Sequence, residues 1–349
     1  MFIKPILLSI ILFALFVLLK PETVKASDWI QQTIDYTINT HFDSAEAVID
    51  ERFAEGDSGL PVYFYKASIL NSRMTHFEED TDLKDFYNIL NVIIDKANQL
   101  IETDKMSDIR ERANVYFYRG SAFGYLAYAQ GKNGQWLKAL DNGLASIKDL
   151  EKSVHIDSTL YDACLGIGVY YYWRSTKLKY MLWLPFVPDM REEGIEQIKL
   201  AIEKGKYSAG LGMQQLIYIL LDYGRFDDAV PYAEKVIKLY PRSQFMRWAH
   251  AHVYSKRHEY DKAIDSYLKL LALIKADPDS NPSHWLFCQV RLAEVYFKQE
   301  KYSSAIEHAQ LALGYQIDRP LKNSEKDKLN QAANILGKSQ KLLQKSAMN

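Results

Sequence analysis

The sequence predicts an all-α protein, a right-handed α-solenoid built from antiparallel helical hairpins. Glycine and proline are scarce, with 16 and 10 copies in 349 residues, whereas the helix formers alanine, leucine, lysine and glutamate are common. An aromatic residue followed three positions later by alanine recurs in the second half of the chain. Each copy opens a stretch with helical spacing of small and apolar residues, and a short turn joins it to a helix upstream.

The recurring pair defines the repeat. Successive copies lie 34 and 42 residues apart, because the loop at residues 276–283 adds eight residues to the second interval. The pairs are Phe226 and Ala229, Tyr260 and Ala263, and Tyr302 and Ala305. A small residue where two helices cross lets their axes approach to about 8–10 Å. One hairpin cannot bury its apolar face alone, so we expect neighbouring hairpins to stack.

This period and these residue types resemble the tetratricopeptide repeat (TPR) family, which implies a TPR-like superhelix that binds proteins. The resemblance is strong over residues 210–314 and degenerate before them, where Phe42 and Trp136 open similar helices. The family's Trp-Leu-Gly opening is missing as a unit almost everywhere. The segment 166–195 is similar to a TPR-like family with a mitochondrial outer-membrane protein and bacterial envelope relatives. That likeness implies an exported, membrane-adjacent protein of bacterial envelope type.

The sequence divides into five expected segments. They are a signal peptide at 1–26, degenerate helical repeats at 27–155, a hairpin at 156–209 with an apolar insertion at 177–190, TPR repeats at 210–318, and a C-terminal capping helix at 319–349. The last segment carries apolar residues on one helical face and lysines over much of the remainder, as a solvated cap should.

The N-terminus has the pattern of a secretory signal. Lys4 precedes an apolar run from Ile6 to Leu19, and small residues follow near Ala26. The run is shorter than the roughly 20 residues that span a membrane. We therefore expect cleavage near Ala26 and a periplasmic or cell-envelope location. The alternative is an uncleaved membrane anchor.

Composition and motifs point away from catalysis and nucleic acid. The net charge is −1, and the basic stretch around Arg174 is too small for a nucleic-acid footprint. Phosphate-binding loops, HExxH and GxSxG are absent from the sequence, so we expect no enzyme activity and no cofactor. Cys164 and Cys288 lie among apolar helical residues, so we expect two buried thiols and no disulfide.

Two clusters of polar residues could suggest a site. His250, His252 and His258 are the best metal candidate, but helical residues two apart point to opposite sides, so we expect no metal site. The acidic runs at 78–80, 192–193 and 227–228 precede or open helices, where negative charge complements the helix dipole.

The expected binding surface is the concave groove, which the first helix of each hairpin lines in TPR arrays. Aromatic and scattered charged residues there suit an extended peptide or a partner helix. The residues expected to face it are Tyr172, Trp173, Tyr218, Asp222, Trp248, His252, Lys256, Glu294, Phe297 and Lys298. The alternative is that several of these aromatic residues pack against the next repeat.

The apolar insertion is the second candidate surface. Its apolar residues include Met181, Leu182, Trp183, Leu184 and Phe186. They could pack internally, contact a membrane peripherally or bind a partner. The sequence thus predicts a non-enzymatic scaffold that holds a partner peptide or protein segment. The alternative is a membrane-associated structural envelope protein, attached through the N-terminal apolar segment or the 177–190 loop.

Overall fold

The computed structural model describes residues 28–104, 106, 108–178, 180 and 188–347. This part of the chain contains fifteen α-helices and no β-strand, so the all-helical prediction is confirmed. The first eight helices are α2 (Trp29–Ile38), α3 (Phe42–Ala54), α4 (Leu60–Phe77), α5 (Leu83–Thr103), α6 (Ile109–Lys132), α7 (Trp136–Ile156), α8 (Ala163–Lys177) and α9 (Arg191–Lys204). The others are α10 (Ala209–Tyr223), α11 (Phe226–Leu239), α12 (Gln244–Lys256), α13 (Tyr260–Ala276), α14 (Pro282–Lys298), α15 (Tyr302–Leu313) and α16 (Asn323–Ala347).

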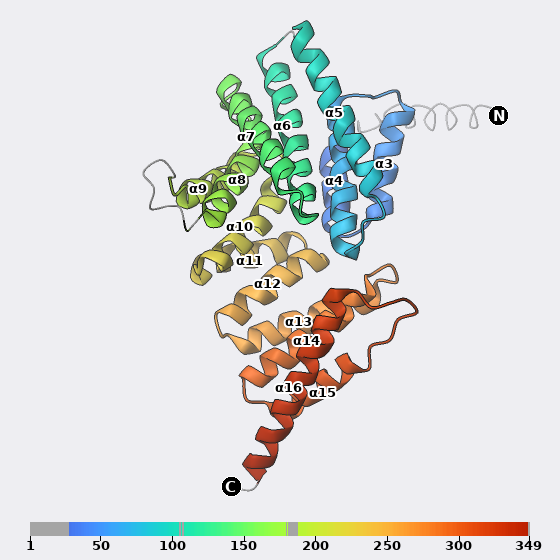
Figure 1. Ribbon diagram of the computed structural model, residues 1–349, viewed down its shortest axis with the longest axis vertical. Coiled ribbons are helices and arrows are strands. Elements are labelled where there is room, and N and C mark those ends of the chain that lie inside the picture. Colours follow the sequence, from blue (N-terminus) through green and yellow to red (C-terminus); the bar gives the residue numbers. More distant parts are fainter. Residues whose placement is uncertain (1–27, 105, 107, 179, 181–187, 348–349) are drawn as a thin grey trace, which may run out of the picture.

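The helices pair in sequence order as antiparallel hairpins, from α2–α3 to α14–α15, and the hairpins stack into a helical solenoid (Figure 1). Ala229, Ala263 and Ala305, the small residues of the repeated pair, are fully buried. Another close crossing lies between α8 and α9. There a side chain on Gly168 would lie 2.4 Å from the carbonyl oxygen of Gly194, so only glycine fits.

The turn inside the hairpins repeats as well. In five of them, the residue two positions before the second helix has a positive φ. These residues are Thr40, Gly134, Gly224, His258 and Glu300, with φ values of 64°, 74°, 81°, 62° and 60°. One turn geometry therefore recurs from α2–α3 to α14–α15, including hairpins whose sequences only weakly match the repeat.

The chain does not extend as an open array, because its N-terminal helices fold back onto the middle. A single apolar core joins α2–α4 to α8–α12 and includes Ile38 and Ile49 from one side and Leu216 and Met246 from the other. The Ser243 hydroxyl donates a hydrogen bond to the Ile38 carbonyl oxygen at 2.5 Å. This fold-back places the C-terminal end of α4 beside the C-terminal repeats (Figure 1).

Candidate functional site

A hollow of about 650 Å³ lies across the first helices of the last three hairpins. α10, α12 and α14 each contribute side chains from their C-terminal halves. One row consists of Tyr218, His252 and Glu294, and a second row consists of Asp222, Lys256 and Lys298. Members of each row are 34 and 42 residues apart, which is the repeat spacing itself. The stacking of hairpins therefore brings equivalent repeat positions together in one surface.

The hollow carries more positive than negative groups. Glu294 is paired, since it accepts hydrogen bonds from Arg291 and Lys298 at 2.8 Å each. Burial alone would raise the pKa of Glu294, but these two cations hold it below its usual value. The Asp222 carboxylate accepts a hydrogen bond from the Tyr172 hydroxyl at 2.7 Å. Among the residues that the structure describes, Lys256 has no ion-pair partner within 4.0 Å, so its charge is available to a ligand.

The wall of the hollow contains buried polar atoms without partners. His252 Nε2 and the Tyr267 hydroxyl are inaccessible to solvent and make no hydrogen bond within the described part of the chain. Burial lowers the pKa of His252 to about 3, so its imidazole is neutral at pH 7. Burial also raises the pKa of Tyr218 to about 12. Buried polar groups are normally hydrogen-bonded, so these two unpartnered atoms are exceptions among the residues that line the hollow.

A second hollow of about 480 Å³ continues the first between α14 and α16. Glu294 lines both hollows, and Gln331 donates a hydrogen bond to it at 3.3 Å. The wall on α16 is rich in carboxamides, from Asn330, Gln331 and Asn334. We use the term groove for the two hollows together. It runs over α10, α12, α14 and α16.

The structure separates the expected groove residues into two sets. Tyr218, Asp222, His252, Lys256, Glu294 and Lys298 line the first hollow, and Phe297 lines the second. Three aromatic residues line neither. Tyr172 is 1% exposed, Trp173 packs on the main core, and Trp248 packs against the core around Tyr267.

Two features of this surface escaped the sequence reasoning. Arg291 is one, because the repeat spacing alone does not single it out. The other is the contribution of α16, which was expected only as a cap. The asparagine and glutamine residues of α16 lie among lysines, so the sequence pattern indicated only a solvent-exposed polar face. An exposed apolar stripe on α7 was also missed, formed by Trp136, Leu137, Leu140 and Leu144, each more than half exposed.

The other candidate clusters have structural partners. His250 contacts the Ser266 hydroxyl through Nδ1 at 2.8 Å, and His258 contacts the Tyr260 hydroxyl at 2.6 Å. Within the described residues no three metal-binding side chains come together. Among the acidic runs, Glu192 and Asp228 both pair with Arg225. Cys164 and Cys288 are buried free thiols, as expected.

Two further expectations fall on residues outside the described part of the chain. They are the signal segment 1–26 and the insertion residues Met181, Leu182, Trp183, Leu184 and Phe186. Within the same insertion, Tyr180 is 79% exposed. Among the helices that the structure describes, none combines the length and apolar character needed to cross a membrane.

Comparison with known proteins finds similarity in fold only. No family model and no curated protein matches the chain. Similar solved structures include YrrB, which is described as a TPR protein with an unusual peptide-binding site. The two sequences are 15% identical, the match covers 57% of this chain and 87% of YrrB, and the TM-score is 0.40. The C-terminal part of a TPR repeat-containing protein from Cytophaga hutchinsonii is similar at 16% identity, with 86% and 99% covered and a TM-score of 0.43.

A TPR protein from Parabacteroides merdae is similar at 15% identity, with 87% of this chain and 97% of that chain covered and a TM-score of 0.39. At such identity and overlap, these likenesses carry no information about site or partner. The paired helices, the repeated turn and the 34-residue register belong to this chain itself. The fold is a helical solenoid of tetratricopeptide type.

Proposed function

We propose that this protein is a non-enzymatic scaffold whose groove holds an extended segment of a partner protein. The observation that carries the proposal is the alignment of equivalent repeat positions on three successive first helices, α10, α12 and α14, into a groove that α16 extends. Such a surface is long and shallow, which suits a polypeptide segment. Neighbouring polar groups in the groove differ in charge from helix to helix. The groove would therefore recognise a bound segment by the charges of that segment's side chains.

The chemistry of the groove favours a polar segment with negative charge. The ammonium group of Lys256 would meet an acidic side chain beside the neutral imidazole of His252. On α16, Asn330, Gln331 and Asn334 offer both donors and acceptors, which suits the peptide backbone of the segment.

A peptide array tests this proposal. The purified chain is applied to an array of 12-residue peptides of varied charge, and the affinity of the best binder is then measured in solution. Changing Lys256→Glu together with Lys298→Glu should weaken that binder at least tenfold, because both side chains line the hollow. The matched control is Lys262→Glu with Lys269→Glu, the same charge change on exposed lysines of α13.

The control pair should bind like the unchanged chain. Equal weakening by both pairs would show a non-specific charge effect, and the absence of any peptide binder would reject the groove as a peptide site. Circular dichroism on each variant checks that the helices remain folded.

We further propose that the protein is exported to the periplasm or cell envelope. The support is the apolar segment at 6–19 with small residues near Ala26. Intact-mass measurement of the protein recovered from fractionated bacterial cells tests it. A mass that still includes residues 1–26 in the cytoplasmic fraction would reject the proposal.

A further inference from the structure

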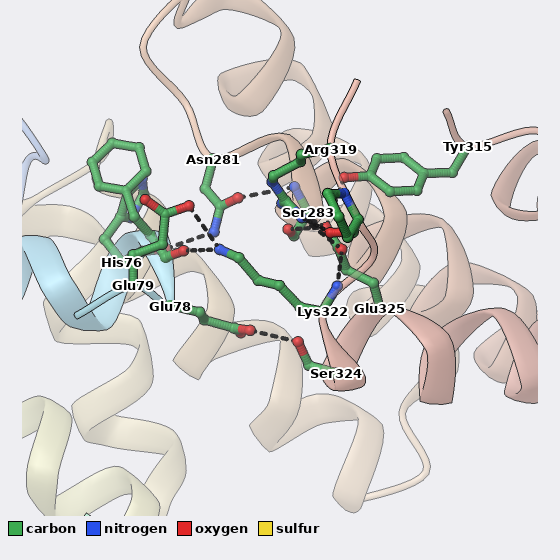
Figure 2. Close-up of polar contacts among 12 residues, drawn as sticks. His76, Glu78, Glu79, Asn281, Ser283, Tyr315, Arg319, Lys322, Ser324 and Glu325 are labelled. Carbon is green, nitrogen blue, oxygen red and sulfur yellow. Dashed lines mark hydrogen bonds and ion pairs between the residues drawn. The ribbon is translucent and has the colours of Figure 1, made fainter. Parts of the chain in front are cut away.

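The C-terminal end of α4 meets residues that lie more than two hundred positions away in the sequence (Figure 2). The Asn281 side-chain amide donates a hydrogen bond to the His76 carbonyl oxygen at 2.8 Å. The Lys322 ammonium donates to the Phe77 carbonyl oxygen and, at 3.0 Å, to the Glu79 carboxylate. The Ser324 hydroxyl donates to Glu78 at 2.7 Å. We call this contact between 76–79 and the segments 281–284 and 315–325 the latch.

One buried carboxylate holds the C-terminal side of the latch in place. Glu325 is 0% exposed and accepts hydrogen bonds from the Ser283 hydroxyl at 2.6 Å and the Tyr315 hydroxyl at 2.8 Å. It also accepts from the Arg319 guanidinium at 2.9 Å and the Lys322 backbone amide at 2.7 Å. Figure 2 shows these groups converging on Glu325. The 315–325 segment is therefore held in one conformation that presents the Lys322 side chain to α4.

Two histidines meet inside the latch, one from each side. The rings of His76 and His284 lie 4.6 Å apart, and their residues are 1% and 9% exposed. Apolar rings surround them, namely Phe42, Phe77 and Phe245 around His76, and Trp248 and Phe287 around His284. Neither Nδ1 atom has a hydrogen-bond partner in the described part of the chain. Burial lowers the pKa of His76 to about 4. For His284, burial together with His76 and Lys322 lowers it to about 3.

We propose that the latch opens in acid, when His76 and His284 take up protons and the end of α4 separates from α14 and from the 315–325 segment. Two imidazolium groups in contact would repel each other. His284 also occupies the third position of α14, where the positive end of the helix dipole opposes a cation. The closed latch therefore tolerates only neutral histidines.

The charged groups around the pair offer no compensation. From the 315–325 segment, Lys322 adds a further positive charge, and Arg319 is engaged by Glu325. Glu79 is paired with Lys322, and Glu78 accepts from Ser324. From the loop before α14, Asp277 accepts a hydrogen bond from Gln244. The ring neighbours on α3 and α12, Phe42 and Phe245, carry no charge.

The two histidines determine that the latch opens, and does not close, as the pH falls. In the open form the histidines are hydrated and their pKa returns to about 6.5, so the open form binds more protons than the closed form. The ratio of open to closed latch should rise about tenfold for each pH unit and each histidine as the pH falls below about 6.5. The apolar core that joins α2 and α3 to α10–α12 consists of side chains that do not titrate in this range. The opening is therefore local.

Hydrogen exchange of the full chain, corrected for the intrinsic effect of pH, measures this opening. Protection at residues 74–80 and 281–286 should fall as the pH drops below about 6.5, approaching tenfold per pH unit per histidine by pH 5, while protection within α10 changes little. The double variant His76→Phe, His284→Phe should lose this pH dependence, because its rings stay neutral among the surrounding aromatic residues. The control His308→Gln removes a half-buried histidine of α15 outside the latch and should keep the dependence.

Constant protection of the two segments in the unchanged chain would overturn the proposal, and so would equal loss of protection in the double variant. If circular dichroism shows that the double variant does not fold, His284→Gln carries the test. This substitution leaves one titrating ring, so the slope of protection against pH should fall by half. An unchanged slope would contradict the proposal.

Discussion

At the residue scale, Glu325 shows how a buried charge can remain ionised. Burial alone would raise the pKa of its carboxyl, but hydrogen bonds from Arg319, Ser283, the Lys322 amide and Tyr315 lower it to about 2. A pattern of spacing cannot identify such a residue, because Glu325 and Asp327 are both acidic residues at the start of the same lysine-rich helix. Its role arises from Ser283, which is 42 positions away and reaches it only in the folded chain.

Glu325 should make stability depend on pH with a known sign. The pKa of Glu325 is lower in the folded chain than the ordinary 4.5. The stability that this carboxylate contributes to the fold is therefore complete above about pH 4.5 and is lost as the pH falls towards 2. Glu325→Gln should therefore lower the free energy of unfolding by about 3 kcal/mol at pH 7 and by much less at pH 3. Urea unfolding followed by circular dichroism measures both values.

Glu307→Gln, an exposed change on α15, serves as the control and should have almost no effect at either pH. If Glu325→Gln lowered the free energy of unfolding by the same amount at pH 7 and pH 3, the carboxylate charge would not be the stabilising feature.

At the scale of elements, the hairpin turn is the conserved geometry of the array. Five turns adopt the left-handed backbone conformation at the same position, but only Gly134 and Gly224 do so with the residue that suits it. Thr40, His258 and Glu300 adopt it with a side chain, which costs about 1–2 kcal/mol. The turn is therefore imposed by the packing of the two helices, and residue preference only assists it.

Substitutions at this position should have opposite effects in two hairpins. Glu300→Gly should stabilise the chain by about 1 kcal/mol, since glycine removes the strain at φ 60°. Gly224→Ala should destabilise it by a similar amount, although a side chain there would meet nothing within 4 Å. Thermal unfolding of both variants measures the difference. A loss of stability in Glu300→Gly would show that backbone entropy outweighs strain at this turn.

At the scale of the whole molecule, the fold-back changes what the array can do. In an open solenoid each hairpin contacts only its neighbours, so stability is nearly a sum of local terms. Here α2–α4 share one core with α8–α12, and the latch ties α4 to the last repeats. The first and middle hairpins should therefore unfold together.

Ile38 offers a test of this coupling. It lies on α2, is 2% exposed, and sits where a side chain on Gly210 of α10 would come within 3.0 Å of it. Ile38→Ala should cost about 2–5 kcal/mol. Hydrogen exchange should show that protection falls in α10–α12 as well as in α2 and α3. A loss confined to α2 and α3 would show that the N-terminal hairpin is an independent unit.

From about residue 210 onward, the sequence by itself determined the hairpins, their register and the repeat positions that share one surface. Local spacing decides which face of a helix is buried, and a fixed period then aligns Tyr218 with His252 and Asp222 with Lys256. Only the tertiary structure decided that Tyr172 and Trp248 pack inside, that α16 lines the groove, and that α4 meets Lys322. These outcomes depend on how small rotations between hairpins accumulate along the array, and no short stretch of sequence encodes that sum.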